Sequence, residues 1–210
     1  MKAVFAALTI FLAAQAGAQD RAGVFDYYVL SLSWSPNWCD ATGRARHSPQ
    51  CAPGAGFGWV LHGLWPQYDR GYPRDCRTSF APPSRVETAA MADIMGTGGL
   101  AWYQWNKHGS CSGLPPKAYF RTARAAHDGI RIPQAFAKLT RDVTLPASLI
   151  EDAFVEANPD LPRDGITVTC SNGAIQEVRI CLTKDLAPRN CKEDVARDCT
   201  LPSAAFGAID

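Results

Sequence analysis

The sequence predicts an α+β fold in which a central antiparallel sheet packs against several helices. Strand-like segments, rich in aromatic and β-branched residues, stand near the two ends of the chain. Segments with helix start and stop signals fill the middle. Because the two kinds of segment do not alternate regularly, a parallel α/β sheet is disfavoured.

The first part of the chain supplies two strands. Residues 25–34 form the first, and its imperfect alternation predicts a central strand that is covered on both faces. Residues 58–64 form the second, with His62 near its end and Gly63 allowing the close approach of another backbone. Two Gly- and Pro-rich segments flank this strand and predict loops: 37–56 and 66–83.

The middle of the chain predicts helices. Ser84 begins one through a capping box with Glu87, and this helix is expected to continue to Met95. A second helix is expected over residues 100–108, with Gly109 as its C-terminal stop. The remaining segments predict further helices at 116–128, 133–140 and 146–156, and a closing hairpin of 166–170 and 174–182 around a turn at 171–173.

Residues 1–18 have the pattern of a signal peptide, with Lys2 at the start, an apolar run, and a small-residue cleavage site that ends at Ala18. The run is too short to span a bilayer, and a retained amphipathic anchor is the alternative. We expect a mature chain that starts near Gln19 and forms one catalytic domain over residues 19–210, in the periplasm or secreted. No later segment is apolar for long enough to be a membrane helix, so no membrane partner is expected.

The charge balance excludes a protein that holds a polyanion through its overall field. The full chain has 21 basic and 20 acidic residues, and loss of the leader removes one lysine and no acid. A neutral mature chain can bind nucleic acid only through a local site of basic and aromatic side chains.

Eight cysteines in an exported chain predict four disulfides. No two cysteines have the C-x-x-C spacing of a zinc site, so free thiols or a bound metal are the weaker alternatives. Spacing alone leaves the pairing open.

Two short segments carry the candidate chemistry, and each holds a histidine beside glycine and tryptophan: WVLHGLWPQ, with His62, and WNKHGSC, with His108. Two imidazoles can serve as general acid and general base near neutral pH, and Lys107 adds a fixed positive charge. Each residue also has a structural interpretation, since a lone histidine is usually a buried, hydrogen-bonded residue and a lone lysine a solvated helix charge. Trp65 could stack on a base or simply pack in the core.

The segment 57–66, FGWVLHGLWP, resembles the first active-site segment of the ribonuclease T2 family. The segment 105–111 resembles the second, whose usual form is His-Glu-Trp-x-Lys-His-Gly-Thr-Cys. The likeness extends to the opening Tyr-Val-Leu-Ser-Leu-Ser-Trp-Ser-Pro and to the cysteine-rich end, so it covers most of the mature chain. The short leader and compact loops look more like those of bacterial, periplasmic members than those of plant or fungal ones.

The resemblance implies an endoribonuclease of low base specificity that cuts single-stranded RNA to 2′,3′-cyclic phosphates, which are then slowly hydrolysed to 3′-phosphates. His62 matches the family's proton donor, His108 its proton acceptor, and Lys107 the cation that stabilises the charge on phosphorus. Trp65 matches a residue that lines the substrate site. The resemblance implies no metal and no other cofactor. DNA should not be cleaved because it lacks the 2′-OH, and a monomer is expected.

The chain departs from the family pattern at two positions, where Tyr103 and Gln104 replace the usual His-Glu. Gln104 can still hydrogen-bond an imidazole or a phosphate, but it cannot raise a histidine pKa by charge. Tyr103 could donate a hydrogen bond to a phosphate oxygen. Both are therefore candidate site residues, and the pair predicts a changed pH optimum. Gln67 replaces an acid found in some relatives, so the base preference does not carry over.

The resemblance also implies the disulfide pairing: Cys39–Cys51, Cys76–Cys111, Cys170–Cys199 and Cys181–Cys191. Two other functions stay open. A catalytically impaired RNA-binding or interaction protein would account for the changes at 103 and 104. A histidine-based phosphodiesterase that acts on cyclic nucleotides would use similar groups.

Overall fold

The computed structural model describes residues 20–137 and 139–209, so the expected signal peptide lies outside the described residues. The strands are β1 (Tyr27–Trp34), β2 (Trp59–Gln67), β3 (Val143–Leu145), β4 (Ile166–Ser171), β5 (Ala174–Leu182) and β6 (Ala204–Phe206). The helices are α1 (Ser35–Trp38), α2 (Arg85–Ala89), α3 (Ala92–Met95), α4 (Gly98–Lys107), α5 (Pro116–Asp128), α6 (Gln134–Ala137) and α7 (Ala147–Ala157). Short π or 3₁₀ segments are η1 (Cys39–Gly43), η2 (Pro49–Cys51), η3 (Gly109–Ser112) and η4 (Arg163–Gly165).

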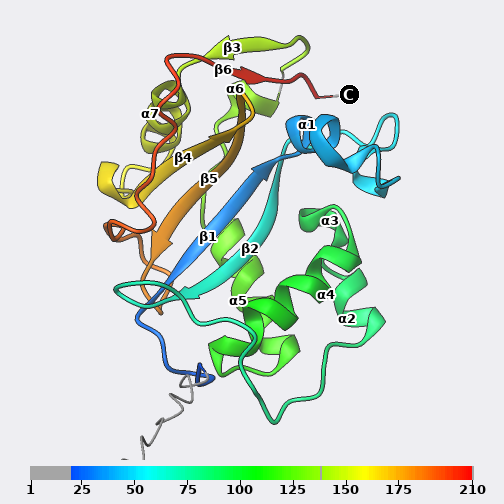
Figure 1. Ribbon diagram of the computed structural model, residues 1–210, viewed down its shortest axis with the longest axis vertical. Helices are drawn as coiled ribbons and strands as arrows, with labels where there is room; N and C mark the ends of the chain where they lie inside the picture. The colour runs from blue at the N-terminus through cyan, green and yellow to red at the C-terminus, as the bar shows by residue number, and fades with distance from the viewer. Residues whose placement is uncertain (1–19, 138, 210) are drawn as a thin grey trace, which may run out of the picture.

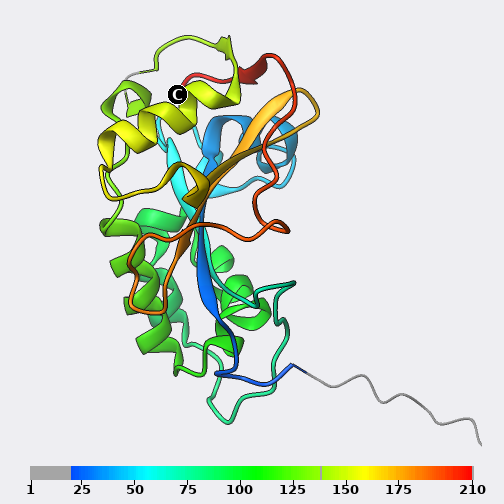
Figure 2. The ribbon, with the colours of Figure 1, turned by 90° about the vertical axis from the view of Figure 1, so that its left-hand side faces the viewer.

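The strands form one sheet in the order β2-β1-β5-β6-β3, with β4 paired to β5 beside this path. Neighbouring strands are antiparallel apart from one parallel bridge between β5 and β6. Helices α2 to α5 gather at one end of the sheet, and α6, α7, β3 and β6 lie at the other end (Figures 1 and 2). The predicted α+β class is confirmed. Within the described ranges, no helix has the length and apolar character needed to span a bilayer.

β1 is the central strand that its sequence predicts. It lies between β2 and β5, and all but one of its side chains are buried. On one face Leu30, Leu32 and Trp34 enter the main core, where Trp34 stacks on Phe206 with ring centroids 4.1 Å apart. The other face carries two serines at the level of the candidate site.

β2 extends past the predicted strand, and His62 lies in its middle rather than near its end. The strand also contains a β-bulge: Leu61 and Gly63 pair with consecutive residues of β1, so His62 has no partner there. The bulge changes the phase of the strand. Leu61 and Leu64 are three positions apart, yet both are fully buried in the main core, while His62 points to the other face.

α2 begins at the predicted capping box. The Ser84 hydroxyl accepts a hydrogen bond from the Glu87 backbone at 3.2 Å, and the Glu87 carboxylate accepts one from the Ser84 backbone at 2.8 Å. The prediction of one continuous helix to Met95 is wrong, because the chain turns after α2 and begins again as α3. Met91, at the break, and Met95, at the end of α3, are both buried in the core.

α4 ends at Lys107, and His108 is its C-cap. The prediction that Gly109 acts as the helix stop is wrong, because Gly109 starts η3 and Gly113 adopts the left-handed conformation, with φ of 76°. Gly109 serves packing instead, since a Cβ there would lie 2.7 Å from the Tyr119 ring.

The C-terminal half follows the predicted pattern closely. α5 and α7 are present, and Asn172 and Gly173 adopt positive φ in the turn of the β4–β5 hairpin. The helix predicted over 133–140 is shortened to α6. Disulfides join the same pairs that the family resemblance implies: Cys39–Cys51, Cys76–Cys111, Cys170–Cys199 and Cys181–Cys191.

Candidate active site

The bulge in β2 brings His62 and Trp65 together. They are the two partly exposed side chains of this strand, and their ring centroids lie 5.3 Å apart. The ring of Trp65 also lies 5.2 Å from that of His108, at the end of α4. One indole therefore contacts both candidate histidines, which come from segments far apart in the sequence.

His62 pairs with an acid on β5. Its Nδ1 lies 2.5 Å from Oε1 of Glu177. The second carboxylate oxygen, Oε2, accepts two hydrogen bonds from the Arg179 guanidinium, at 2.9 Å from Nε and 2.6 Å from Nη2. The same guanidinium lies 5.5 Å from the centre of the Trp65 ring. These four side chains form a closed circuit of contacts around the candidate proton donor.

The Glu177 carboxylate carries a stable negative charge. Burial raises its pKa, but the hydrogen bond and charge of His62, together with Arg179, outweigh burial and lower the pKa to about 2. The carboxylate is therefore ionised throughout the range in which imidazoles titrate. It therefore places a fixed negative charge beside His62, the candidate proton donor.

His108 has the opposite surroundings. It is 6% exposed, and its Nδ1 has no hydrogen-bond partner in the part of the chain that the structure describes. Burial, then the charge of Lys107 and that of His62, lower the pKa of His108 from 6.5 to about 3. The imidazole is neutral near pH 7, and a neutral imidazole can accept a proton.

Gly63 makes room for a hydrogen bond that fixes Trp65. The indole Nε1 donates to Oε1 of Gln104 at 2.8 Å, and Gln104 is 1% exposed. A Cβ at position 63 would lie 2.4 Å from the indole nitrogen and 2.5 Å from the amide oxygen. Gly63 does permit a close approach, although the groups that approach are side chains and not the predicted backbone.

Lys107 and Tyr103 lie on α4 beside the histidines. The Lys107 ammonium is 5.7 Å from the centre of the Tyr103 ring, and Tyr103 is half exposed. Over residues 20–137 and 139–209, no carboxylate forms an ion pair with Lys107. Its charge is therefore available to an anion. A cleft of about 910 Å³ has His62, Glu177 and Tyr103 in its wall, whereas Trp65, Lys107 and His108 do not line it.

The other two histidines differ in position. His47 lines the same cleft, in the segment after η1. His127 lies on α5 and pairs with Asp128 at 2.9 Å. In the described ranges, no group of His, Cys, Asp and Glu side chains is arranged to hold a metal ion.

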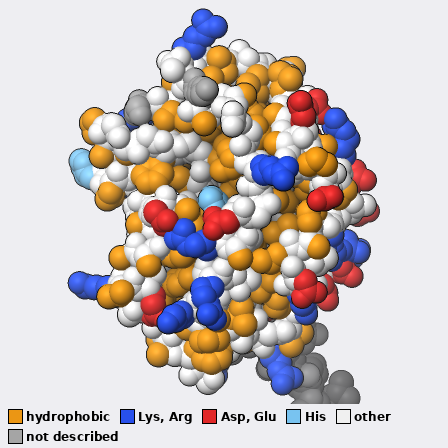
Figure 3. Space-filling view, turned by 180° about the vertical axis from the view of Figure 1, so that it is seen from behind, with side chains coloured by type: hydrophobic (Ala, Val, Ile, Leu, Met, Phe, Trp, Pro, Cys, Tyr) orange, Lys and Arg blue, Asp and Glu red, His pale blue; other side chains and the backbone are white. Residues whose placement is uncertain are grey.

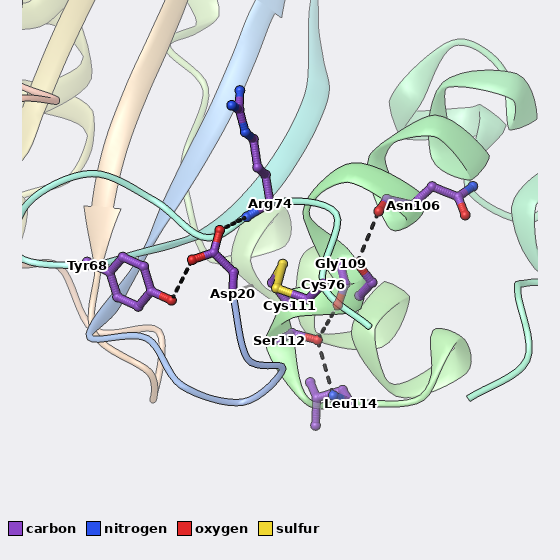
Figure 4. Close-up of a disulfide and its surroundings, with 10 residues drawn as sticks. Asp20, Tyr68, Arg74, Cys76, Asn106, Gly109, Cys111, Ser112 and Leu114 are labelled. Atoms are coloured by element: carbon purple, nitrogen blue, oxygen red, sulfur yellow. Dashed lines mark hydrogen bonds between the residues drawn. A yellow bond between two sulfur atoms is a disulfide. The ribbon is translucent and has the colours of Figure 1, made fainter. Parts of the chain in front are cut away.

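The Cys76–Cys111 disulfide fastens the turn that follows His108 (Figure 4). It joins η3 to the loop after β2, and the Asp75 backbone N–H donates to the Lys107 carbonyl at 2.9 Å beside it. Two side-chain hydrogen bonds stabilise the same turn: Ser110 Oγ to the Asn106 carbonyl and Ser112 Oγ to the Gly109 carbonyl. Together these contacts hold the backbone that carries His108.

Charges of both signs are mixed on the face in Figure 3, around a recessed histidine near its centre. This mixture agrees with the balanced totals of 21 basic and 20 acidic residues. Attraction of an anion must therefore come from cations close to the histidines, chiefly Lys107 and Arg179.

Glu177 and Arg179 are the site residues that sequence analysis missed. The available signal was two charged residues, two positions apart, within a largely apolar predicted strand. Charges on a buried strand need partners, so this pair pointed to a contact. Its identity could not be read from the sequence, because His62 lies on a strand that is separated from β5 by β1.

Comparison with known proteins identifies the family of the chain. The model of the Ribonuclease T2 family matches residues 25–191. A ribonuclease of Aeromonas hydrophila is 33% identical over 183 residues, which cover 80% of this chain and 76% of that protein. A probable ribonuclease of Haemophilus influenzae is 31% identical over 152 residues, which cover 66% of this chain and 55% of that protein. The RNase-related protein from Calystegia sepium has a similar fold, with a TM-score of 0.70 at 20% identity, over 89% of this chain and 98% of that one.

The fold and the family match define a ribonuclease. The chain belongs to the ribonuclease T2 family, as its two histidine segments predict.

Proposed function

We propose that this ribonuclease is an endoribonuclease that cleaves single-stranded RNA by transphosphorylation, with low base specificity and without a metal. The observation that carries the proposal is the pair of histidines on Trp65, one beside an ionised carboxylate and the other buried and neutral. One imidazole suited to give a proton and one suited to take a proton are the two groups that this reaction needs.

In the first step, neutral His108 takes the proton of the ribose 2′-OH, and O2′ attacks the adjacent phosphorus. Protonated His62 gives its proton to O5′, so the bond from phosphorus to O5′ breaks as the bond to O2′ forms. The products are a 2′,3′-cyclic phosphate and a free 5′-OH. The histidines have then exchanged protonation states, so in the slower second step His62 activates water and His108 returns a proton to O2′, which gives a 3′-phosphate.

The remaining candidates act on the phosphate and the base. Lys107, which has no ion-pair partner in the described ranges, stabilises the negative charge that builds up on the phosphorus oxygens. Tyr103, half exposed in the wall of the cleft, donates a hydrogen bond to a phosphate oxygen. Trp65 offers part of its ring to a base, while Gln104 holds that ring in place from behind. DNA is not a substrate because it lacks the attacking 2′-OH.

We also propose that the protein acts outside the cytoplasm as a monomer. Four disulfides are typical of proteins that fold in an oxidising compartment. In this proposal residues 1–18 direct export, cleavage occurs near Gln19, and residues 19–210 form the single domain.

The proposal is tested by incubating the purified protein with homopolymer RNAs in EDTA, from pH 4 to 8, with single-stranded DNA in parallel. We expect 2′,3′-cyclic ends on RNA and intact DNA. His62→Ala and His108→Ala should each lower the rate by about 10²–10⁴-fold. His127→Ala is the matched control and should keep full activity, because His127 pairs with Asp128 away from the site.

Three outcomes would overturn the proposal. Binding of RNA without cleavage would identify an impaired RNA-binding protein, in which Tyr103 and Gln104 mark lost activity. Turnover of small cyclic nucleotides alone would identify a different phosphodiesterase. Cleavage that EDTA abolishes would assign the chemistry to a metal.

A further inference from the structure

A charged pair on β5 faces the candidate site across the central strand. Glu177 is 4% exposed and Arg179 is partly buried. Each carboxylate oxygen has its own partner, with Oε1 on His62 and Oε2 on Arg179. A carboxylate with so little access to water is costly to bury, so its partners must compensate for lost hydration.

The sheet register explains how these side chains reach the site. β1 separates β5 from β2, and on β1 Ser33 pairs with Glu177 while Ser31 pairs with Arg179. Serine is small, so the longer side chains of β5 can lie over β1 and contact β2. A large residue at either serine would occupy the space between Glu177 and His62.

The contact also fixes which imidazole nitrogen faces the substrate. An ionised carboxylate only accepts hydrogen bonds, so the Nδ1 of His62 must donate to Glu177. Nε2 is then the nitrogen that is left to face the cleft, where a phosphodiester would lie. Other charged or titratable groups face this position from different elements: His108 and Lys107 at the end of α4, Arg179 on β5, and Arg46 and His47 in the cleft wall.

We propose that Glu177, held in place by Arg179, is a positioning residue that fixes His62 through Nδ1, so that Nε2 carries the proton to the departing 5′-oxygen. This inference rests on the proposed function, in which His62 is the general acid. Arg179, which holds Glu177, also lies against the face of Trp65. Glu177 is therefore linked through Arg179 to the tryptophan ring that contacts both histidines.

The test is Glu177→Gln, which keeps the size of the side chain and removes its charge. We expect kcat on a dinucleotide to fall by about 10- to 100-fold, less than the loss from removing the acid itself, with KM changed by less than about twofold. The pH dependence of kcat should also differ from that of the unmodified protein, because the general acid loses its charged hydrogen-bond partner. Glu177→Asp, which keeps the charge, should recover part of the lost kcat.

Glu151→Gln is the matched control. Glu151 is a partly buried carboxyl that accepts a hydrogen bond from the Val168 backbone, but it lies on α7, away from the histidines. Its replacement should change neither kcat nor the pH profile. If Glu177→Gln behaves like this control, Glu177 has only a structural role and the inference is overturned.

A measurement on the unmodified protein covers the case in which Glu177→Gln does not fold. Nitrogen-15 NMR should show the proton of neutral His62 on Nδ1, and finding it on Nε2 would overturn the inference. His62→Ala separates this inference from the proposed function. A fully active His62→Ala would overturn both, whereas an inactive His62→Ala beside a normal Glu177→Gln would overturn only the role of Glu177.

Discussion

The two histidines of the site differ in almost every physical respect. His62 lies on β2, the edge strand of the sheet, is one-third exposed, and pairs with an ionised carboxylate. His108 lies at the end of a helix, is buried, and has no hydrogen-bond partner for Nδ1 within the described residues. Burial, followed by the charge of Lys107, lowers the pKa of His108, whereas His62 has an ionised carboxylate as its hydrogen-bond partner.

The two histidines are also held by different means. The bulge and its neighbours in the sheet fix His62, so its position depends on long-range strand pairing. The last turn of α4 and the Cys76–Cys111 disulfide fix His108, so its position depends on local structure and one covalent bond. Trp65 is the one side chain that contacts both histidines in the structure described here.

The sharpest test of this contrast uses a substrate whose leaving group needs no proton, such as a 4-nitrophenyl ester of uridine 3′-phosphate. On a dinucleotide, His62→Ala and His108→Ala should both lose about 10²–10⁴-fold in kcat. On the nitrophenyl ester, His62→Ala should return to within about tenfold of the unmodified enzyme, whereas His108→Ala should keep its full loss. The reverse pattern would show that the two roles are exchanged, and equal losses on both substrates would remove the distinction.

A smaller effect is expected when the packing of Trp65, which contacts both histidines, is disturbed. Gly63→Ala would push a methyl group against Trp65 and Gln104, both of which are packed. We expect kcat to fall by about tenfold, and the free energy of unfolding to fall by about 1–3 kcal/mol, as for an overpacked site. Kinetics and chemical denaturation would measure the two losses. Gly129→Ala, at the end of α5, is the control and should leave kcat unchanged; equal kcat in both variants would show that Trp65 does not align the site.

The smallest effect is a shift in pH dependence. Gln104→Glu would place a carboxylate beside Trp65 near His108, and this charge should raise the pKa of His108 from about 3. A general base must be neutral, so a raised pKa removes activity on the acid side. We expect kcat/KM at pH 4 to fall by about tenfold relative to pH 7, with little change at pH 7.

Gln134→Glu is the control, because it makes the same glutamine-to-glutamate change at an exposed position on α6. A pH profile of Gln104→Glu that matches this control would mean that position 104 does not tune His108. It would also show that having Gln104 where the family usually has glutamate does not change the pH optimum.

Much of the fold could be predicted because its signals are local. The capping box at Ser84, the α5 helix and the Asn172-Gly173 turn each depend on residues within a few positions of one another. The prediction that Gly109 acts as a helix stop failed because this glycine is needed for a tertiary contact, its close packing against the ring of Tyr119. The three-residue strands β3 and β6 are too short to leave a periodic pattern.

The candidate site could be predicted only in part, for the same reason. His62, His108 and Lys107 stand in motifs, whereas Glu177 is 115 positions from His62 and depends on strand order and register for its contact. The sequence also could not predict which side chains of β2 face the core after the bulge, because a bulge can be recognised only when the partner strand and its register are known.

The bulge makes the site depend on the number of residues in β2 as well as on their kinds. Leu61 and Leu64 share one face, and His62 and Trp65 the other, because one unpaired residue separates the two halves of the strand. Deletion of Gly63 would remove the bulge, and regular alternation would then keep Leu61, Leu64 and Trp65 on their present faces. It would nevertheless remove the residue whose lack of a side chain makes room for Trp65 and Gln104. The site therefore depends both on one extra residue in β2 and on that residue having no side chain.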